Sequence, residues 1–589
     1  MASITRHLSD LFGSAFAGLG LDPALGTVVA SQRPELGQFQ CNGALAAAKA
    51  AGRNPRELAE EIAAVVAGDP AVASVSIAGP GFINVDVTDE HLAAVLGAKV
   101  GDDRLGLEMP AEPVRYVVDY GGPNVAKELH VGHLRPAIIG ESVKRLIAFA
   151  GHEAIGDVHL GDWGTPMGQI IALLAERRPE LPYVDPDQEG LFPTESPVTV
   201  DDLEELYPQA SARAKEDAAF AEAARAATVA LQDGRPGYRA LWQHFRDVSV
   251  ASMQAIYDDL DVHFELWNGE ASVHDRIAPM IERIRDAGVI VESDGALIID
   301  VAEPGDTKEI PPLLLVKRDG GYLYGTTDLA TIEERVDDLG AESMIYVVDA
   351  RQSLHFEQVF RAARKAGIAP PGVTMEHDPF GTVNGPDGKP MRTRDGNLPR
   401  LRGLIDDAIA RAAQRLEEND LVTGYDAAER AEIARVVGIA ALKYGDLSNH
   451  RTSDYIFDLD RFVSFEGKTG PYMLYGAVRI RSILRHAAER GLASGTILAP
   501  TVDAERALML RLTRFEDVIA RALEFRAPNH LAEYAYEVAT DFNRFYEVCH
   551  ILNEPDPARQ ASWLGLVDLT LATLRKLLDL LAIEAPERM

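Results

Sequence analysis

Two histidines, His130 and His133, stand on either side of Val131-Gly132, where a strand-like run gives way to a helical one. A helix start has free N–H groups and the positive end of the helix dipole, and both attract phosphate. Histidines at this spacing face one side of the first turn, so both can donate hydrogen bonds to the α-phosphate of ATP. Gly132 lets the adenine approach the backbone. The pattern indicates nucleotide chemistry by electrostatic positioning; two incidental histidines or a metal pair is the alternative.

The elements around these histidines follow the order of a parallel α/β sheet. Residues 114–120 are rich in β-branched and aromatic side chains, and a helix with an apolar stripe begins near His133. Residues 154–159 predict the next strand, and the same order returns with a strand at 344–348 and a helix at 354–366. This order is typical of a Rossmann-like, doubly wound sheet, where ligands bind at the carboxyl ends of the strands.

The rest of the chain predicts two flanking regions and an insertion. Residues 1–108 predict a small α/β module with a helix at 54–67 and strands at 71–77 and 82–87. A mostly helical, acidic insertion occupies about 175–310. From about residue 403 onward the chain is nearly all helix, and one helix carries apolar residues at a spacing that predicts a buried stripe: Ile433, Val436, Val437, Ala440 and Ala441.

Composition limits the class of protein. The 589 residues carry a net charge of −33, which disfavours indiscriminate binding to nucleic acid because phosphate attracts cations. A local basic stretch at 389–402 keeps a specific nucleic-acid partner open. The two cysteines, Cys41 and Cys549, cannot build a disulfide framework or a cysteine-rich zinc site. No apolar run is long enough to span a bilayer, and the N-terminus lacks a secretory signal, so we expect a cytoplasmic protein without membrane contact.

Seventeen consecutive residues, 119–135, resemble the HIGH signature of class I aminoacyl-tRNA synthetases in the form used by the bacterial-type arginyl-tRNA synthetase family. Further blocks that resemble this family extend across the chain: Gly161–Thr165, Tyr322–Ala330 (similar to its arginine-pocket strand), Asp349–Phe356, Asp446–Tyr455 and Phe465–Tyr472. The resemblance implies four segments: an N-terminal module that contacts the tRNA elbow (1–108), a catalytic domain with the insertion (109–375), a signature loop with stem-contact helices (376–455) and an all-helical anticodon-binding domain (456–589).

The same resemblance implies an activity and its partners. We expect an arginine–tRNA ligase that forms arginyl-adenylate from L-arginine and ATP, with Mg²⁺ accompanying the nucleotide. It would transfer arginine to the 3′ end of tRNA(Arg), with AMP and pyrophosphate as the other products. Family members usually require tRNA for the first step. We expect a monomer without protein-bound zinc.

Catalytic roles at the phosphates are carried over from the family. These roles fall on His130, His133, Lys127 and the loop Lys389-Pro390-Met391-Arg392-Thr393-Arg394. Arginyl enzymes often lack the second lysine of this loop, and Lys127 is thought to compensate. Arg392 stands where that lysine would be, and keeps the charge without the compact ammonium geometry. A solvated basic turn is the alternative for this loop.

A pocket for arginine should offer carboxylates to a planar, always charged guanidinium. Asp328 and Tyr324 correspond to family positions that bind the arginine side chain, and Asp119 corresponds to a second acid. Asn124 and Gln352 would hold the α-amino or carboxylate end. A helix N-cap is the alternative for Asp328, because Thr326-Thr327-Asp328 precedes apolar residues.

Two stretches depart from the family pattern. Gly121-Gly122 stands where the family commonly begins with a serine, which could loosen the loop before Asn124, and Pro166-Met167 replaces Gln-Phe.

Near the C-terminus, Tyr472 and Tyr475 could stack on unpaired anticodon bases.

Three other functions remain open. Another class I synthetase is the nearest, although a cysteinyl enzyme would need the zinc pocket that this chain cannot build. A small nucleotidyltransferase would leave the helical C-terminal third unexplained. A catalytically inactive tRNA-binding paralogue is disfavoured by intact His130, His133 and Lys389.

Overall fold

The computed structural model describes residues 3–33, 35–188, 190–318, 320–392 and 398–589. The chain forms two compact units. The central unit comprises Pro110–Ser464 and Leu580–Glu584, and the terminal unit comprises Met1–Met109, Phe465–Asp579 and Ala585–Met589. Among the described residues, none of the helices combines the length and apolarity needed to cross a bilayer.

A four-stranded parallel sheet organises the central unit. Its order is β11-β10-β5-β6, with bounds Thr374–His377, Ser343–Val347, Arg115–Tyr120 and Glu153–Asp157 respectively. The predicted α/β class with a parallel sheet is confirmed. Both predicted strand–helix pairs form, since β5 leads into α5 (Leu134–Phe149) and β10 into α12 (Ser353–Lys365).

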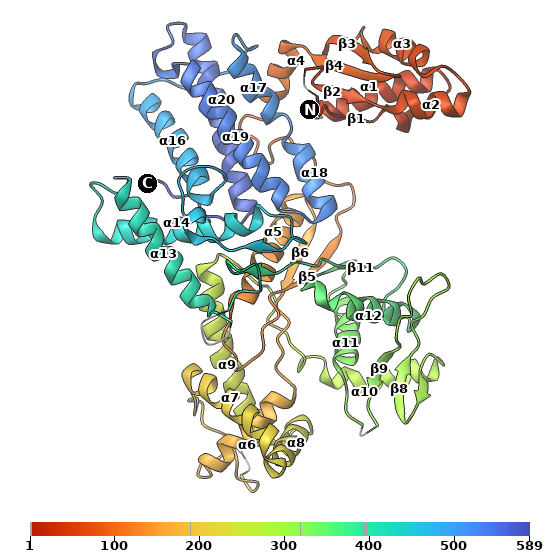
Figure 1. Cartoon of the computed structure of the whole chain (residues 1–589), viewed down its shortest axis with the longest axis vertical. Helices are drawn as coiled ribbons and strands as arrows, with labels where there is room; N and C mark the ends of the chain where they lie inside the picture. The colour runs from red at the N-terminus through yellow and green to blue at the C-terminus, as the bar shows by residue number, and fades with distance from the viewer. Residues whose placement is uncertain (1–2, 34, 189, 319, 393–397) are drawn as a thin grey trace. The chain divides into compact units, whose positions relative to one another are not determined.

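Helices cover both faces of this sheet. Successive strand residues point to opposite sides, so each strand contacts helices on both. On one side Tyr120 of β5 contacts α5, where its hydroxyl donates to Glu141 at 2.7 Å. On the other side Val117 joins an apolar core with α10 (His274–Asp286), α11 (Tyr324–Asp337) and α12. Figure 1 shows α11 and α12 beside one another on this side.

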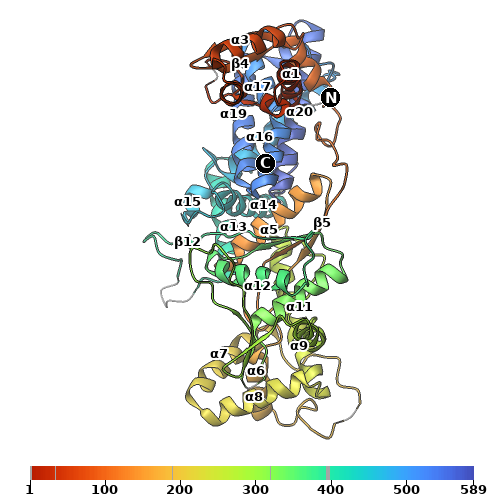
Figure 2. The ribbon, with the colours of Figure 1, turned by 90° about the vertical axis from the view of Figure 1, so that its right-hand side faces the viewer.

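The insertion between β6 and β10 is mainly helical, as predicted, and also contains a small sheet. Its helices pack together below the parallel sheet in Figure 2: α6 (Thr165–Arg177), α7 (Val200–Glu216), α8 (Ala218–Gln232) and α9 (Pro236–Asp259). After α10 come three antiparallel strands, β7 (Val291–Ser293), β8 (Ala296–Ile299) and β9 (Leu313–Val316).

The last part of the central unit begins with a short strand, β12 (Val383–Asn384), which pairs with β13 (Tyr455–Ile456). Between them lie α13 (Leu401–Glu418) and α14 (Ala427–Leu447), followed after β13 by α15 (Leu459–Phe462). The predicted apolar stripe of α14 is buried, which confirms that expectation.

The terminal unit combines an N-terminal antiparallel sheet with C-terminal helices. The sheet order is β1-β2-β4-β3, with bounds Val28–Ala30, Phe39–Cys41, Phe82–Val87 and Val72–Ala78 respectively. Helices accompany the sheet: α1 (Ile4–Gly18), α2 (Gly43–Ala51), α3 (Pro55–Val66) and α4 (Asp89–Gly97). The C-terminal helices are α16 (Gly470–Glu489), α17 (Asp503–Leu512), α18 (Phe515–Phe525), α19 (Asn529–Val548) and α20 (Pro557–Leu580).

Candidate active site

The two signature histidines lie at the start of α5, on a single 3-10 turn, η2 (Val131–His133). The His130 Nδ1 accepts a hydrogen bond from the Gly132 N–H at 3.1 Å, and the His133 Nδ1 accepts from the His130 N–H at 3.0 Å. The two rings are stacked with centroids 4.0 Å apart. An Nδ1 that accepts leaves the proton of a neutral ring on Nε2, so each histidine can donate through Nε2.

Both histidines are held in the neutral form. Burial lowers the pKa of His133 to about 3, and the nearby charge of His130 adds to the effect. Burial, followed by the positive charge of Lys127, lowers the pKa of His130. Neutral imidazoles with free Nε2–H groups bind a phosphate oxygen as dipoles, without an added fixed positive charge.

Gly132 is needed for the local packing. A Cβ at this position would lie 2.9 Å from the His130 ring. The glycine therefore keeps the His130 ring in its capping position, a constraint additional to the close approach of adenine that the sequence predicts.

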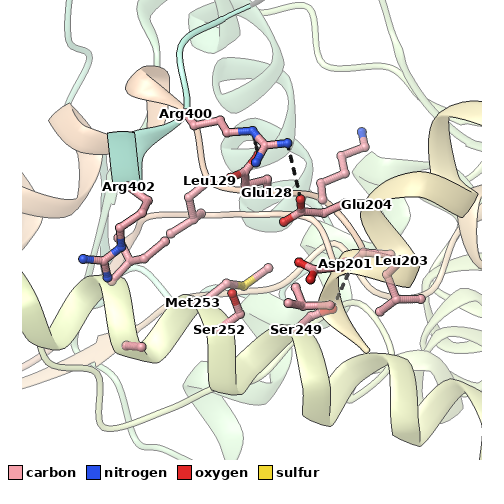
Figure 3. A pocket seen from close by; sticks show the side chains of 15 residues that line it. Glu128, Leu129, Asp201, Leu203, Glu204, Ser249, Ser252, Met253, Arg400 and Arg402 are labelled. Carbon is pink, nitrogen blue, oxygen red and sulfur yellow. Dashed lines mark hydrogen bonds and ion pairs between the residues drawn. The ribbon is translucent and has the colours of Figure 1, made fainter. Parts of the chain in front are cut away.

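Lys127 lines a cavity of about 320 Å³ between residues 126–129, which precede the histidines, and the helices α7 and α9. Its ammonium lies 4.7 Å from the centroid of the Tyr207 ring. Figure 3 shows Arg400 between two acids of this cavity, Glu128 at 2.6 Å and Glu204 at 3.6 Å. Lys127 thus lies close to the histidines in sequence, and its positive charge contributes to the lowered pKa of His130. Two acids of the insertion, Asp201 and Glu204, line the same cavity.

The second signature loop is only partly described. Lys389 and Arg392 are exposed, whereas Thr393 and Arg394 lie outside the described residues. After residues 393–397, which are not described, the chain pairs with the histidine segment through its backbone: Val131 N–H donates to Pro399 O, and Leu401 N–H donates to Leu129 O, both at 2.9 Å. Residues 399–401 are therefore paired with the segment that carries the histidines.

The segment Tyr322–Ala330, expected to resemble a strand, is a helix from Tyr324 onward, so that expectation is wrong. The run Gly325-Thr326-Thr327 has low helix propensity, but Thr326 is stabilised by donating its hydroxyl hydrogen to Leu315 O at 2.6 Å. Leu323 is the N-cap, so Asp328 lies inside the first turns of α11 and is not a cap. Its Oδ2 lies 2.5 Å from Nε2 of His355 on α12, and this hydrogen bond raises the pKa of His355.

Glu270 is a buried acid near α11 that the sequence does not point to. It follows α9 in a loop whose backbone pairs with Leu160, just beyond β6. Burial, followed by the carboxylate of Asp162, raises the pKa of Glu270 to about 7, and Asp328 contributes in the same direction. Tyr324, which is 73% exposed, lies near enough for the charge of Glu270 to raise its pKa, after burial. Only the tertiary fold brings this loop acid to α11.

Asp119 is engaged by a side chain of the protein itself. Arg335 Nη2 donates to Asp119 Oδ2 at 2.5 Å and to Asp157 Oδ2 at 2.6 Å. His159 lies beside them, with Nδ1 3.8 Å from Asp157. Burial opposes a charged His159, but the carboxylate of Asp157 outweighs it and raises the pKa of His159 to about 9. Burial raises the pKa of Asp119, against the opposing effect of Arg335.

This cluster also has the geometry of a metal site. Asp119, Asp157 and His159 each offer a ligand atom, and these atoms all lie within 4.8 Å of one another. The guanidinium of Arg335 already supplies positive charge to both carboxylates, so the donor set does not need a cation for charge balance.

Asn124 and Gln352 lie at the exits of β5 and β10. Asn124 forms an isolated bridge with Gly161, where a Cβ would lie 2.2 Å from the Asn124 Oδ1. Gln352 ends the 3-10 turn η3 (Ala350–Gln352) and is exposed. Gly121 and Gly122 have φ values of 92° and 42°, so the departure from serine supplies the conformational freedom that this loop requires.

The proposed anticodon-contact tyrosines lie on α16. The Tyr472 hydroxyl accepts a hydrogen bond from Asn543 at 2.9 Å, whereas Tyr475 is 40% exposed. Arg479 lies over the Tyr546 ring, 4.6 Å from its centroid. Tyr475 is therefore the more accessible of the two rings.

A histidine pair at the carboxyl end of such a parallel sheet is a feature of class I aminoacyl-tRNA synthetases, and residues 100–459 match the family model "tRNA synthetases class I (R), catalytic domain". Residues 2–87 match "Arginyl tRNA synthetase N terminal domain", and 473–589 match "DALR anticodon binding domain". The chain belongs to the arginyl-tRNA synthetase family.

Full-length relatives agree with this assignment. The chain is 49% identical to the arginine–tRNA ligase of Alkaliphilus oremlandii and 50% identical to that of Maricaulis maris, over 100% of each chain. It is similar to the arginyl-tRNA synthetase structure from Plasmodium falciparum, with a TM-score of 0.83 at 25% identity over 100% of both chains. The Thermus thermophilus structure has the same fold, with a TM-score of 0.80 at 24% identity over 100% of both chains.

Proposed function

We propose that this protein attaches L-arginine to tRNA(Arg) with ATP as the energy source. The observation that carries the proposal is Asp328 on α11, held 2.5 Å from His355, with Tyr324 one turn earlier on the same helix and the buried carboxyl of Glu270 within electrostatic reach of both. A guanidinium pairs with carboxylates in a planar, bidentate manner that a lysine ammonium cannot reproduce. Full-length similarity to arginine–tRNA ligases supports the same substrate.

The first step joins arginine to the nucleotide. A carboxylate oxygen of arginine attacks the α-phosphorus of ATP, the bond to the bridging α–β oxygen breaks, and pyrophosphate leaves with that electron pair. His130 and His133 donate their Nε2–H groups to the α-phosphate as negative charge builds on it. Mg²⁺ enters with the nucleotide as part of the substrate.

Basic side chains act on the leaving group. Lys127 and Lys389 neutralise the developing charge of pyrophosphate, and Arg392 adds charge with a different geometry. Lys127 lies over the Tyr207 ring in a cavity that Glu204 and Asp201 also line, and we propose that its side chain turns from this ring toward the phosphates of ATP. The backbone link at 399–401 anchors the chain beyond this loop to the histidine segment, which supports the assignment of the loop to the phosphates.

Arginine is held at both ends. Asp328, Glu270 and Tyr324 bind the side chain, while Asn124 and Gln352 bind the α-amino or carboxylate end. Asp119 belongs to the same pocket and is already paired with Arg335, so it acts on the substrate through its neighbours.

The second step transfers arginine to tRNA. The 2′- or 3′-hydroxyl of the terminal adenosine attacks the acyl carbon, loses its proton, and AMP leaves. The N-terminal module contacts the tRNA elbow, and α16 with Tyr475 contacts the anticodon. Each step uses residues of one chain, and we propose that the enzyme works as a monomer.

The test is the attachment of each of the twenty amino acids to total tRNA in the presence of ATP and Mg²⁺. We expect charging with arginine alone. Charging with another amino acid would contradict the pocket assignment, and binding of tRNA without any charging would support an inactive paralogue.

A further inference from the structure

A row of three side chains crosses the parallel sheet at its carboxyl end. Asp119 of β5 is in register with Asp157 of β6 and with Tyr346 of β10. Residues in register on parallel strands point to the same face, so all three face the helices on the α11 side. Val117, two residues before Asp119, points to the same side and packs in the core that includes α11.

Arg335 of α11 covers this entire row. Its Nη2 bonds both carboxylates, and its guanidinium carbon lies 5.2 Å from the centroid of the Tyr346 ring. The side chain is only 1% exposed, and its Nε and Nη1 have no hydrogen-bond partner among the described residues. Leaving two donors of a buried guanidinium without hydrogen bonds costs free energy of folding. The hydrogen bonds of Nη2 to the two acids are therefore the contacts that hold the side chain in this position.

The helical repeat connects Arg335 to the substrate pocket. Residues four, seven and eleven positions apart share one face of an α-helix, so Tyr324, Asp328 and Arg335 lie along one stripe of α11. At 1.5 Å per residue, Asp328 lies about 10 Å along the axis from Arg335. Thr331, on the same stripe, has its hydroxyl 3.5 Å from the His159 ring, beside the same acids.

We propose that Arg335 is a positioning residue for arginine recognition, which fixes the rotation and axial position of α11 on the sheet and thereby places Asp328 and Tyr324. The proposal rests on the arginine-binding role of these two residues. Arg335 also occupies Asp119 and Asp157 through its own hydrogen bonds. The Oδ2 of Asp328 is bonded to His355, so we assign its Oδ1, together with the carboxylate of Glu270, to the substrate guanidinium.

Lysine at position 335 keeps the charge but cannot hold both carboxylates with the same geometry. A shift of α11 by a fraction of a turn would misplace Asp328, and misplacement of about 1 Å can cost about 100-fold in catalytic efficiency. We expect R335K to raise the KM for arginine by about 10- to 100-fold. We expect the KM for ATP to stay within about twofold of wild type, because His130 and His133 are positioned by their own backbone contacts.

The experiment measures steady-state arginylation and arginine-dependent pyrophosphate exchange for wild type, R335K and R335Q, with thermal unfolding in parallel. The matched control is R511K in the terminal unit, where Arg511 likewise bridges two carboxylates, Asp541 at 2.8 Å and Glu537 at 2.5 Å. This control should keep the wild-type KM for arginine. A purely structural role would lower the active fraction and leave both KM values unchanged.

A folded R335K with a wild-type KM for arginine, or with equal increases in both KM values, would overturn the proposal. If neither variant at position 335 folds, D157A decides, because it removes the acceptor at position 157 and keeps Arg335; a raised KM for arginine supports the proposal and an unchanged KM refutes it. Failure of the wild-type enzyme to charge arginine would instead refute the proposed function itself.

Discussion

At the scale of single residues, the site depends on which atoms keep their protons. His130 and His133 accept backbone hydrogens through Nδ1, which fixes the tautomer that donates from Nε2. Burial keeps His133 neutral and raises the pKa of Glu270 to about 7. The histidines proposed to bind the phosphate are therefore neutral at pH 7. The carboxyl of Glu270, proposed to bind arginine, changes its charge near pH 7.

Replacing His130 by asparagine separates its two roles. Asparagine can accept the Gly132 N–H as an N-cap, but it has no group equivalent to Nε2–H. We expect H130N to have the same melting temperature as the wild type. Its kcat for adenylate formation should fall about 100-fold or more, since one hydrogen-bond donor to the phosphate is lost. Alanine at the same position should lose the cap as well. Near-normal pyrophosphate exchange by H130N would remove this histidine from the mechanism.

The pKa of Glu270 predicts how arginine binding depends on pH. Below about pH 7 the carboxyl is protonated and neutral, and above it the carboxylate attracts the guanidinium. The KM for arginine should therefore fall as pH rises, by about tenfold from about pH 6 to about pH 8 if binding needs the ionised form. E270Q should have a higher KM without this pH dependence. The same profile in both enzymes would exclude Glu270 as its cause.

At the scale of elements, strand ends and helix starts place each group. β5, β6 and β10 end beside one another, and the loops after them carry Asn124, His159 and Gln352. The sequence predicts β5 and β10 well because their apolar residues are contiguous. It does not predict the start of α11, because Gly325-Thr326-Thr327 has low helix propensity and the helix is stabilised there by contacts with β9.

The glycine pair after β5 allows a test of this loop. Gly121 has a φ of 92°, and a Cβ would lie 3.1 Å from the Tyr257 hydroxyl, whereas Gly122 has a φ of 42° and open space. We expect G121A to destabilise the protein by about 2 kcal/mol or more and G122A by about 1 kcal/mol. G121A should also raise the KM for arginine, since Asn124 follows it. Denaturant unfolding and arginine kinetics give both values; equal effects of the two changes would contradict the steric argument.

At the scale of the whole molecule, the groups assigned to adenylate formation all belong to the central unit. The terminal unit has its own stabilising contacts, including an ion pair between Lys99 and Glu516, whose side chains are 4% and 10% exposed. The sequence predicts the β3–β4 pair of this unit and its helices from local patterns. It could not predict the Lys99–Glu516 pair, or Glu270 in the pocket, because each depends on residues that are distant in sequence.

Removing one member of the Lys99–Glu516 pair tests this separation. K99M leaves a buried carboxylate without its cation and should destabilise the terminal unit by about 3 kcal/mol, while K99M/E516L should recover much of the loss. Denaturant unfolding measures both. At a temperature where the protein is folded, the KM for arginine in pyrophosphate exchange should be unchanged in K99M. An altered KM would show that this pair also affects the arginine pocket.

The most direct test of the central claim is pyrophosphate exchange with tRNA present, driven in turn by arginine, lysine and citrulline, the uncharged ureido analogue of arginine. The proposed arginine site of Asp328, Glu270 and Tyr324 selects for both charge and planarity, so we predict exchange with arginine and at least about 1,000-fold lower catalytic efficiency with the other two. Comparable exchange with citrulline would show that the carboxylates do not select the substrate, and comparable exchange with lysine would show that planar pairing does not.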